Sequence, residues 1–252
     1  MSLPNLLLTA VAIASISGST AAKAEGGPVR NVVLVHGAFA DGSGWKPVAD
    51  LLRADGYEVS IVQQPMTSVA DDVAATIRIL DMQSGPAVLV GHSYGGAVIT
   101  EAGHHANVAS LVFVAAFAPA EGEALGAVSA ATPPAAHSIA PTADGYLLVD
   151  PAQFPADFAA DLPLQTAEFM AISQMPINGQ IWGTPIGVPA WQNKPSFGIV
   201  ATADRMINPE LQRAMYARAN AQVTEIDSSH SVFLSQPQAV ADVIKAAAAA
   251  EK

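Results

Sequence analysis

The segment Val-Gly-His-Ser-Tyr-Gly-Gly at residues 90–96 restricts the possible folds of this chain more than any other feature. It follows a short apolar run typical of a buried strand and precedes a stretch with helical spacing. A serine with a glycine two positions away on each side fits a sharp strand-to-helix turn, which raises the serine hydroxyl above the edge of a sheet. The motif therefore predicts a strand-turn-helix unit that carries Ser93 as a candidate nucleophile.

Apolar runs and helical repeats alternate along the chain on both sides of this segment. The pattern predicts strands at residues 30–35, 57–62, 87–90, 109–115, 196–200 and 221–226, and helices at 45–54, 69–80, from 97 onward, 208–219 and 239–249. Strands that alternate with helices form right-handed crossovers and a parallel sheet. The predicted fold class is therefore α/β, with a mostly parallel, doubly wound sheet and helices on both of its faces.

The alternation stops between residues 119 and 195, where Pro, Ala, Gly and Met are frequent and no strong strand run occurs. A structureless loop of this length is implausible inside one compact domain. We therefore interpret residues 119–195 as a small inserted cap of short helices. Residues 25–118 and 196–252 then form the core of the domain.

The first 24 residues differ from the rest of the chain. A short apolar run at residues 6–16 is followed by Ala22-Lys23-Ala24, which fits a small-residue cleavage pattern before Glu25, although residues 1–5 carry no Lys or Arg. We interpret residues 1–24 as a signal peptide, which predicts a periplasmic or secreted mature protein. A retained apolar N-terminal helix, with a cytoplasmic location, is the alternative.

Composition excludes several classes of partner. The chain has 11 basic and 22 acidic residues and a net charge of −11, so its surface repels nucleic acid and anionic lipid. Outside the N-terminus no apolar run approaches the roughly 20 residues of a membrane span, so no stable membrane association is expected. The chain has no cysteine, and no nucleotide-binding glycine pattern follows a strand. The sequence predicts a small molecule as partner, no metal and no cofactor, and makes no prediction about the oligomeric state.

A serine hydroxyl becomes an effective nucleophile when a base accepts its proton. His230, on a loop after the last predicted strand, is the candidate base. Asp204 follows the strand at 196–200 and is the candidate acid that orients it; Asp227, Glu121 and Glu123 are the alternatives. The resulting chain order, serine then acid then histidine, is the order known for triads on sheets of this kind.

An acyl-transfer site also needs N–H donors for the oxyanion, each worth about 3–4 kcal/mol. The N–H of Tyr94 directly follows the nucleophile, and the N–H of Ala38 lies in the loop after the first strand, with Phe39 as the alternative second donor. His36 is expected to shape this loop. His92 is expected to point away from the face that the nucleophile uses.

With these residues in place the chain resembles the α/β-hydrolase superfamily. Residues 33–38 and 91–96, together with the Asp204 and His230 loops, are similar to those of small esterases related to plant methyl esterases and hydroxynitrile lyases, and most similar to bacterial, pyrethroid-type esterases. The resemblance implies a cofactor-independent mechanism. Ser93 would attack an ester carbonyl, His230 would protonate the alcohol, and water activated by His230 would release the acid.

The resemblance also implies that a triad of this kind can serve activities other than ester hydrolysis. Hydroxynitrile lyases carry a threonine after the first-loop histidine and a lysine near the catalytic histidine, whereas this chain has Gly37 and Ser231 at those places. Hydrolysis is therefore favoured over lyase chemistry. A perhydrolase that forms peracids, and a receptor that binds its ligand without turnover, are further alternatives.

Apolar side chains of the predicted cap offer either a substrate-binding surface or the cap's own core. They are Phe154, Phe158, Phe169, Met170, Met175, Ile181, Trp182 and Trp191. Phe39 and Trp182 are the candidate substrate contacts. The expected substrate is a small, neutral, fairly apolar carboxylic ester.

Overall fold

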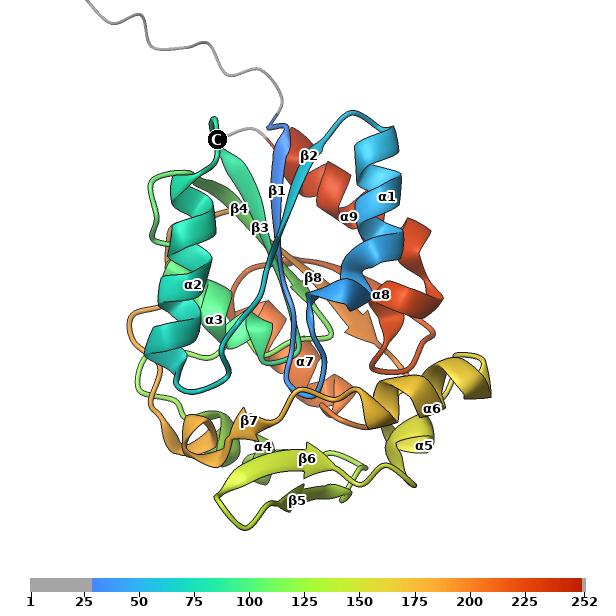
Figure 1. Ribbon diagram of the computed structural model, residues 1–252. Helices are drawn as coiled ribbons and strands as arrows, with labels where there is room; N and C mark the ends of the chain where they lie inside the picture. The colour runs from blue at the N-terminus through green and yellow to red at the C-terminus, as the bar shows by residue number, and fades with distance from the viewer. Residues whose placement is uncertain (1–28, 251–252) are drawn as a thin grey trace, which may run out of the picture.

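A six-stranded parallel sheet forms the centre of the computed structural model, which describes residues 29–250 (Figure 1). The strand order is β2-β1-β3-β4-β8-β9. The strands are β1 (Asn31–Val35), β2 (Glu58–Val62), β3 (Ala87–His92), β4 (Val108–Val114), β8 (Ser196–Ala201) and β9 (Gln222–Ile226). This arrangement confirms the doubly wound parallel sheet predicted from the sequence.

Helices cover both faces of the sheet, as the alternating pattern predicts (Figure 1). One face is covered by α1 (Lys46–Ala54), α8 (Val232–Ser235) and α9 (Pro237–Ala249), and the other by α2 (Val69–Asp81), α3 (Gly95–Ala102) and α7 (Pro209–Arg218). Every residue of β1, β3, β4 and β8 is buried, which explains why these strands read as continuous apolar runs. Burial of each Val or Leu side chain contributes about 1.5–3 kcal/mol to the stability of the fold. The ends of these strands are therefore held in place by a tightly packed sheet.

Local sequence signals fix the ends of the helices beside the site. The Ser68 hydroxyl accepts the N–H of Asp71 and so caps the first turn of α2. Helix α1, which precedes α2 in the chain, buries Val48 and Leu52 and is followed by Gly56 with φ +81°, a conformation that glycine adopts without strain.

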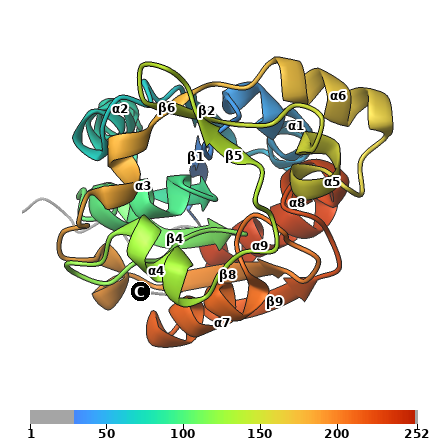
Figure 2. The ribbon, with the colours of Figure 1, turned by 90° about the horizontal axis from the view of Figure 1, so that it is seen from below.

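The cap leaves the core after β4 and returns at β8, and Figure 1 shows it below the carboxyl ends of the parallel strands. Its helical elements are α4 (Leu125–Ala131), α5 (Phe154–Phe158), α6 (Leu164–Ile172), η2 (Gly179–Gly183) and η3 (Ala190–Gln192). Seen from below, α5 lies beside α8 of the core (Figure 2).

The cap also contains a three-stranded antiparallel sheet that the prediction of short helices omitted. It consists of β5 (Ile139–Pro141), β6 (Tyr146–Val149) and β7 (Ile177–Asn178). Strands of two to four residues are too short to show a two-residue periodicity. Gly145, with φ +85°, forms the turn between the first two.

The signal-peptide interpretation concerns residues 1–24, which lie outside the described residues, so it stays a prediction. Between residues 29 and 250, none of the helices combines the length and the hydropathy that crossing a membrane requires.

Candidate active site

Ser93 stands on the turn between β3 and α3 in a left-handed backbone conformation, with φ +53°. For a residue with a side chain this conformation costs about 1–3 kcal/mol and persists only where the surroundings hold it. Here the Ser93 carbonyl accepts the N–H groups of Gly96 at 3.0 Å and of Phe117 at 3.1 Å. The turn is therefore held both by the following helix and by the segment that follows β4.

The glycines of the motif are needed because backbone approaches backbone at this turn. A Cβ atom added to Gly91 would lie 2.5 Å from the carbonyl oxygen of Gly95, and one added to Gly96 would lie 2.1 Å from that of Phe117. No side chain fits at such distances. The glycine pattern is thus a direct consequence of a tight strand-turn-helix geometry.

Asp204 and His230 form a buried pair. The His230 Nδ1 lies 2.7 Å from Asp204 Oδ2, and the two side chains are 1% and 0% exposed. Asp204 Oδ1 accepts the N–H groups of Met206 and Ile207, while Oδ2 also accepts the Gln212 side-chain amide at 2.8 Å. Because these donors fix the carboxylate as an acceptor, His230 presents its Nδ1–H to it and keeps Nε2 free for other partners.

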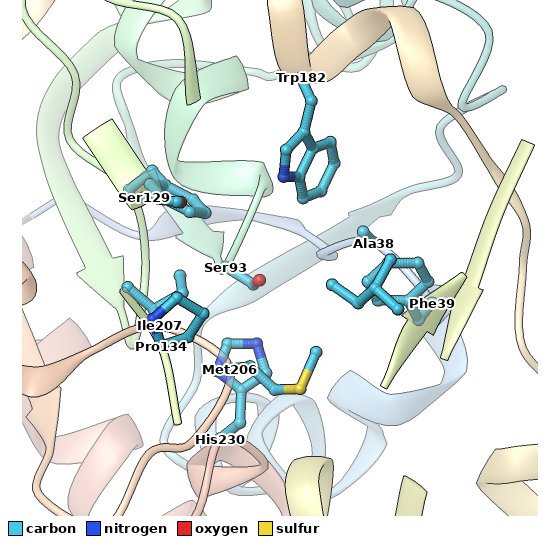
Figure 3. A pocket seen from close by; sticks show the side chains of 11 residues that line it. Ala38, Phe39, Ser93, Ser129, Pro134, Trp182, Met206, Ile207 and His230 are labelled. Atoms are coloured by element: carbon cyan, nitrogen blue, oxygen red, sulfur yellow. The ribbon is translucent and has the colours of Figure 1, made fainter. Parts of the chain in front are cut away.

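Ser93 and His230 line the same cavity, of about 70 Å³, beneath the cap. Figure 3 shows the Ser93 hydroxyl between His230 on one side and the Trp182 indole on the other. The other residues that line this cavity are Ala38, Phe39, Phe117, Ser129, Pro134, Ile139, Met206 and Ile207. Ala38 and Phe39, the two candidates for the second oxyanion donor, and Trp182, the other candidate substrate contact, therefore line the cavity around Ser93. Tyr94, the first candidate donor, directly follows Ser93 in the chain.

The loop after β1 lies directly against the nucleophile. A Cβ atom on Gly37 would lie 2.6 Å from the Ser93 Cβ, so this backbone approaches the serine as closely as glycine allows. His36 shapes the loop: its Nδ1–H donates to the Gly37 carbonyl at 3.0 Å and its Nε2 accepts the Gln64 N–H at 3.1 Å. Burial lowers the pKa of His36, so it is a neutral structural residue.

His92 points away from the cavity, as expected, but it has a partner that the sequence did not indicate. Its Nε2–H donates to the His230 carbonyl at 2.9 Å, and the centroids of the two imidazole rings lie 4.6 Å apart. Burial, followed by the charge of His230, holds the pKa of His92 well below its usual value. A neutral imidazole thus supports the backbone of the candidate base. Its position next to Ser93 in the sequence was the only available signal.

A second buried pair lies behind Tyr94. The Tyr94 hydroxyl donates to Asp72 Oδ2 at 2.7 Å, and Asp72 Oδ1 accepts the Met66 N–H at 2.9 Å. Burial raises the pKa of both the Asp72 carboxyl and the Tyr94 hydroxyl. This bond anchors the residue whose N–H is the candidate oxyanion donor, and sequence reasoning missed it.

The alternative acids lie elsewhere. Asp227 and Glu121 are exposed, and Glu123 forms an ion pair with Arg218 at 2.7 Å. Of the four acidic candidates, the structure brings Asp204 to His230.

The other histidines of the sequence lie away from the cavity. His104 donates to the Val188 carbonyl, His105 contacts Asp81 and His137 is exposed. Among the residues that the structure describes, no group of three or more His, Asp or Glu side chains could hold a metal ion.

A second and larger cavity, of about 170 Å³, lies on the other side of Phe39. Its cap wall is formed by α6, and its core wall by the loop after β1 and by α8. The residues that line it are Phe39, Ala40, Asp41, Ser43, Gly44, Thr166, Phe169, Met170, Ser173, Phe233 and Leu234. Of the apolar cap residues named from the sequence, Trp182 lines the Ser93 cavity, Phe169 and Met170 line this one, and Phe154, Phe158 and Ile181 are buried in the core.

A serine on a strand-turn-helix elbow, followed along the chain by a hydrogen-bonded Asp–His pair at the same sheet edge, is the arrangement of α/β-hydrolases. Residues 32–243 match the family model described as the alpha/beta hydrolase family, and the chain belongs to this family.

Particular relatives extend this assignment. The chain is 28% identical to a pyrethroid hydrolase of Sphingobium wenxiniae over 251 residues, covering 86% of each chain. It is 34% identical to a carbendazim hydrolyzing esterase of a Nocardioides species over 109 residues, which span 38% of this chain and 45% of that protein.

Solved structures agree. A pyrethroid hydrolase from Sphingobium faniae superposes with a TM-score of 0.77 at 25% identity, covering 88% of this chain and 98% of that one. Polyneuridine aldehyde esterase shares the fold with a TM-score of 0.74 at 18% identity, covering 86% and 98%. The predicted family, fold class and enzyme class, an ester hydrolase of the α/β-hydrolase type, are thereby confirmed.

Proposed function

We propose that this enzyme hydrolyses small, neutral, apolar carboxylic esters through an acyl-enzyme on Ser93. One observation carries the proposal: Ser93 and His230 share a small cavity, and Asp204 is bonded to the far side of the His230 ring. This arrangement supports His230 as the base that activates the serine.

Acylation begins when the Ser93 Oγ attacks the ester carbonyl carbon and its proton passes to His230 Nε2. The carbonyl oxygen becomes an oxyanion that accepts the N–H groups of Ala38 and Tyr94. The C–O bond to the alcohol then breaks, and the His230 imidazolium gives its proton to the departing alcohol oxygen. Asp204 stabilises the imidazolium while it exists.

Deacylation repeats these steps with water. His230 Nε2 accepts a proton from the water, whose oxygen attacks the acyl carbon. The ester bond to Ser93 breaks, and the proton on His230 returns to the Ser93 Oγ. The products are one alcohol and one acid.

The cavity supports the choice of substrate. Its polar side chains are the hydroxyls of Ser93 and Ser129 and the imidazole of His230, and the remaining lining is apolar. Such a lining favours neutral groups, because a charge buried without a partner is costly. The named activities of the Sphingobium and Nocardioides relatives, on a pyrethroid and on carbendazim, also support a hydrolase for neutral organic molecules.

Two positions support hydrolysis over hydroxynitrile lyase chemistry. At Gly37 a Cβ atom would lie 2.6 Å from the Ser93 Cβ, so a threonine there would displace the nucleophile. Ser231, at the place of the lyase lysine, is fully buried and donates its hydroxyl to the Phe158 carbonyl, away from the cavity.

A nucleophile test uses the two hydroxyls of the cavity. Ser93→Ala is expected to lower kcat on p-nitrophenyl acetate by about 10⁵-fold or more and to abolish labelling by a fluorophosphonate probe. Ser129→Ala, in the same cavity, should remain labelled at Ser93. Turnover by Ser93→Ala close to that of the wild type, or a label on another residue, would refute the proposal.

A further inference from the structure

A turn of the cap is hydrogen-bonded to the loop that carries His230. Asp161 lies three residues after the end of α5, and its Oδ2 accepts the Ser228 hydroxyl at 2.7 Å and the Ser229 N–H at 3.0 Å. Its Oδ1 accepts the Ser229 hydroxyl. One carboxylate therefore receives three hydrogen bonds from the two residues that precede the candidate base.

The same turn also contacts the residue after the base and the base itself. The Phe158 carbonyl accepts the Ser231 hydroxyl at 2.9 Å, and the Phe158 ring packs edge-on against the His230 ring, with centroids 4.8 Å apart. The His230 loop is thus held by the cap on both sides of the histidine. Figure 2 shows the corresponding proximity of α5 to α8.

The charge of Asp161 suits this arrangement. Partial burial raises the pKa of its carboxyl, but the hydrogen bonds from Ser229 and Ser228 outweigh burial and leave the pKa below its usual value. The group is consequently ionised at neutral pH, and hydrogen bonds to an ionised acceptor are about twice as strong as neutral ones.

The serines of this loop are buried, so their position depends on these partners. Ser228, Ser229 and Ser231 are each at most 3% exposed. The Asp204 carboxylate fixes the rotation of the His230 ring. Asp161 and Phe158 hold the backbone on either side of that ring, and His92 holds the His230 carbonyl itself.

We propose that Asp161 is a positioning residue for the reaction: by holding Ser228 and Ser229 it sets where the His230 imidazole stands relative to Ser93. The inference rests on the proposed function, in which His230 transfers protons to and from the serine. A displacement of about 1 Å in such a group can cost about 100-fold in rate. The cap thereby assembles the catalytic base as well as enclosing the substrate.

The test compares Asp161→Asn with a matched control elsewhere in the cap, Glu123→Gln. Glu123 also accepts three hydrogen bonds, from the Ala120 N–H and twice from Arg218, and these tie the start of the cap to α7 without touching the His230 loop. Each variant replaces a carboxylate that accepts three hydrogen bonds by an amide of similar shape. A general loss of cap stability would affect both variants, whereas a positioning role affects Asp161→Asn alone.

Asp161→Asn is expected to lower kcat by about tenfold or more while KM changes less than about twofold, because the base is misplaced and the apolar cavity is kept. Glu123→Gln should retain kcat. Asp161→Glu should recover part of the loss, since the carboxylate is restored. Adding Ser229→Ala to Asp161→Asn should reduce kcat little further, because both changes remove the same contact.

A readout independent of turnover is the proton NMR signal of His230 Nδ1–H in the bond to Asp204, identified by its loss in Asp204→Asn. We expect this signal to shift or broaden in Asp161→Asn and to stay unchanged in Glu123→Gln. If Asp161→Asn does not fold, Ser229→Ala gives the same comparison with a smaller change.

Unchanged kcat and an unchanged His230 signal in Asp161→Asn would overturn the inference, as would equal losses of kcat in Asp161→Asn and Glu123→Gln. An altered His230 signal in a protein whose wild type hydrolyses no ester would instead reject the proposed function and leave the positioning role supported.

Discussion

Asp204→Asn tests how the buried acid controls its histidine. Four donors surround the Asp204 carboxylate: the N–H groups of Met206 and Ile207 on Oδ1, and Gln212 Nε2 and His230 Nδ1 on Oδ2. An asparagine has one oxygen, which the two backbone N–H groups retain. Its NH₂ group then faces His230, so the imidazole must carry its proton on Nε2 and cannot accept one from Ser93.

The expected loss follows from this change of tautomer. A comparable substitution in a serine triad lowers kcat by about 10⁴-fold, which corresponds to about 5.4 kcal/mol of transition-state stabilisation. The variant should also lose about 1–3 kcal/mol of folding stability, because the new NH₂ opposes the Gln212 NH₂. Gln212 has little freedom to turn over, since its Oε1 accepts the Ala201 N–H at 3.3 Å.

Initial rates on p-nitrophenyl acetate, the rate of fluorophosphonate labelling and urea unfolding measure these effects. Asp227→Asn is the matched control, because Asp227 lies three residues from His230 but is exposed. It should retain near-normal kcat. The assignment of the acid would be wrong if Asp204→Asn kept more than about one-tenth of the wild-type kcat while Asp227→Asn kept less than that.

Three further predictions follow from the packing around the elbow. Phe39 lines both cavities, so Phe39→Ala should join them and raise the ratio of kcat/KM for octanoyl over acetyl p-nitrophenyl esters by about tenfold or more; an unchanged ratio would contradict this. Gly96→Ala places a Cβ 2.1 Å from the Phe117 carbonyl and should be insoluble or at least about 2 kcal/mol less stable in urea, whereas Gly183→Ala, with no atom within 4 Å of its Cβ, should unfold like the wild type. Burial raises the pKa of Asp72 above its usual 3.8, so ionisation destabilises the folded state as pH rises through the raised pKa. The stability of the wild type relative to Asp72→Asn should consequently fall as the pH rises from the usual 3.8 through the raised pKa, and a constant difference would rule out this effect.

The sequence was sufficient to predict the features that depend on the order of strands. Ser93, Asp204 and His230 each follow a predicted strand, and the carboxyl ends of parallel strands share one edge. Strand order alone therefore predicts that these residues approach one another, and the structure brings Asp204 within 2.7 Å of His230. The triad roles themselves remain proposals for the variants described above.

Contacts made by tertiary packing were not visible in the sequence. Asp161 and Ser229 are 68 residues apart, and no periodic pattern relates a cap turn to a core loop. The bond between Asp72 and Tyr94 did leave a weak signal. Asp72 lies three residues after Val69 and next to Val73, on the apolar face of α2, so its side chain had to enter the core and find a partner there.

The position of the cap within the chain has a consequence for how this enzyme can diversify. The insertion leaves after β4 and returns at β8, and these two strands pair directly, so the sheet is continuous across the point of insertion. Evolution or an engineer could exchange such a segment as a module and inherit an intact hydrolytic core. A grafted cap would still need an anionic side chain at the place of Asp161. Only caps that keep this contact with the core could therefore give the enzyme a new range of substrates.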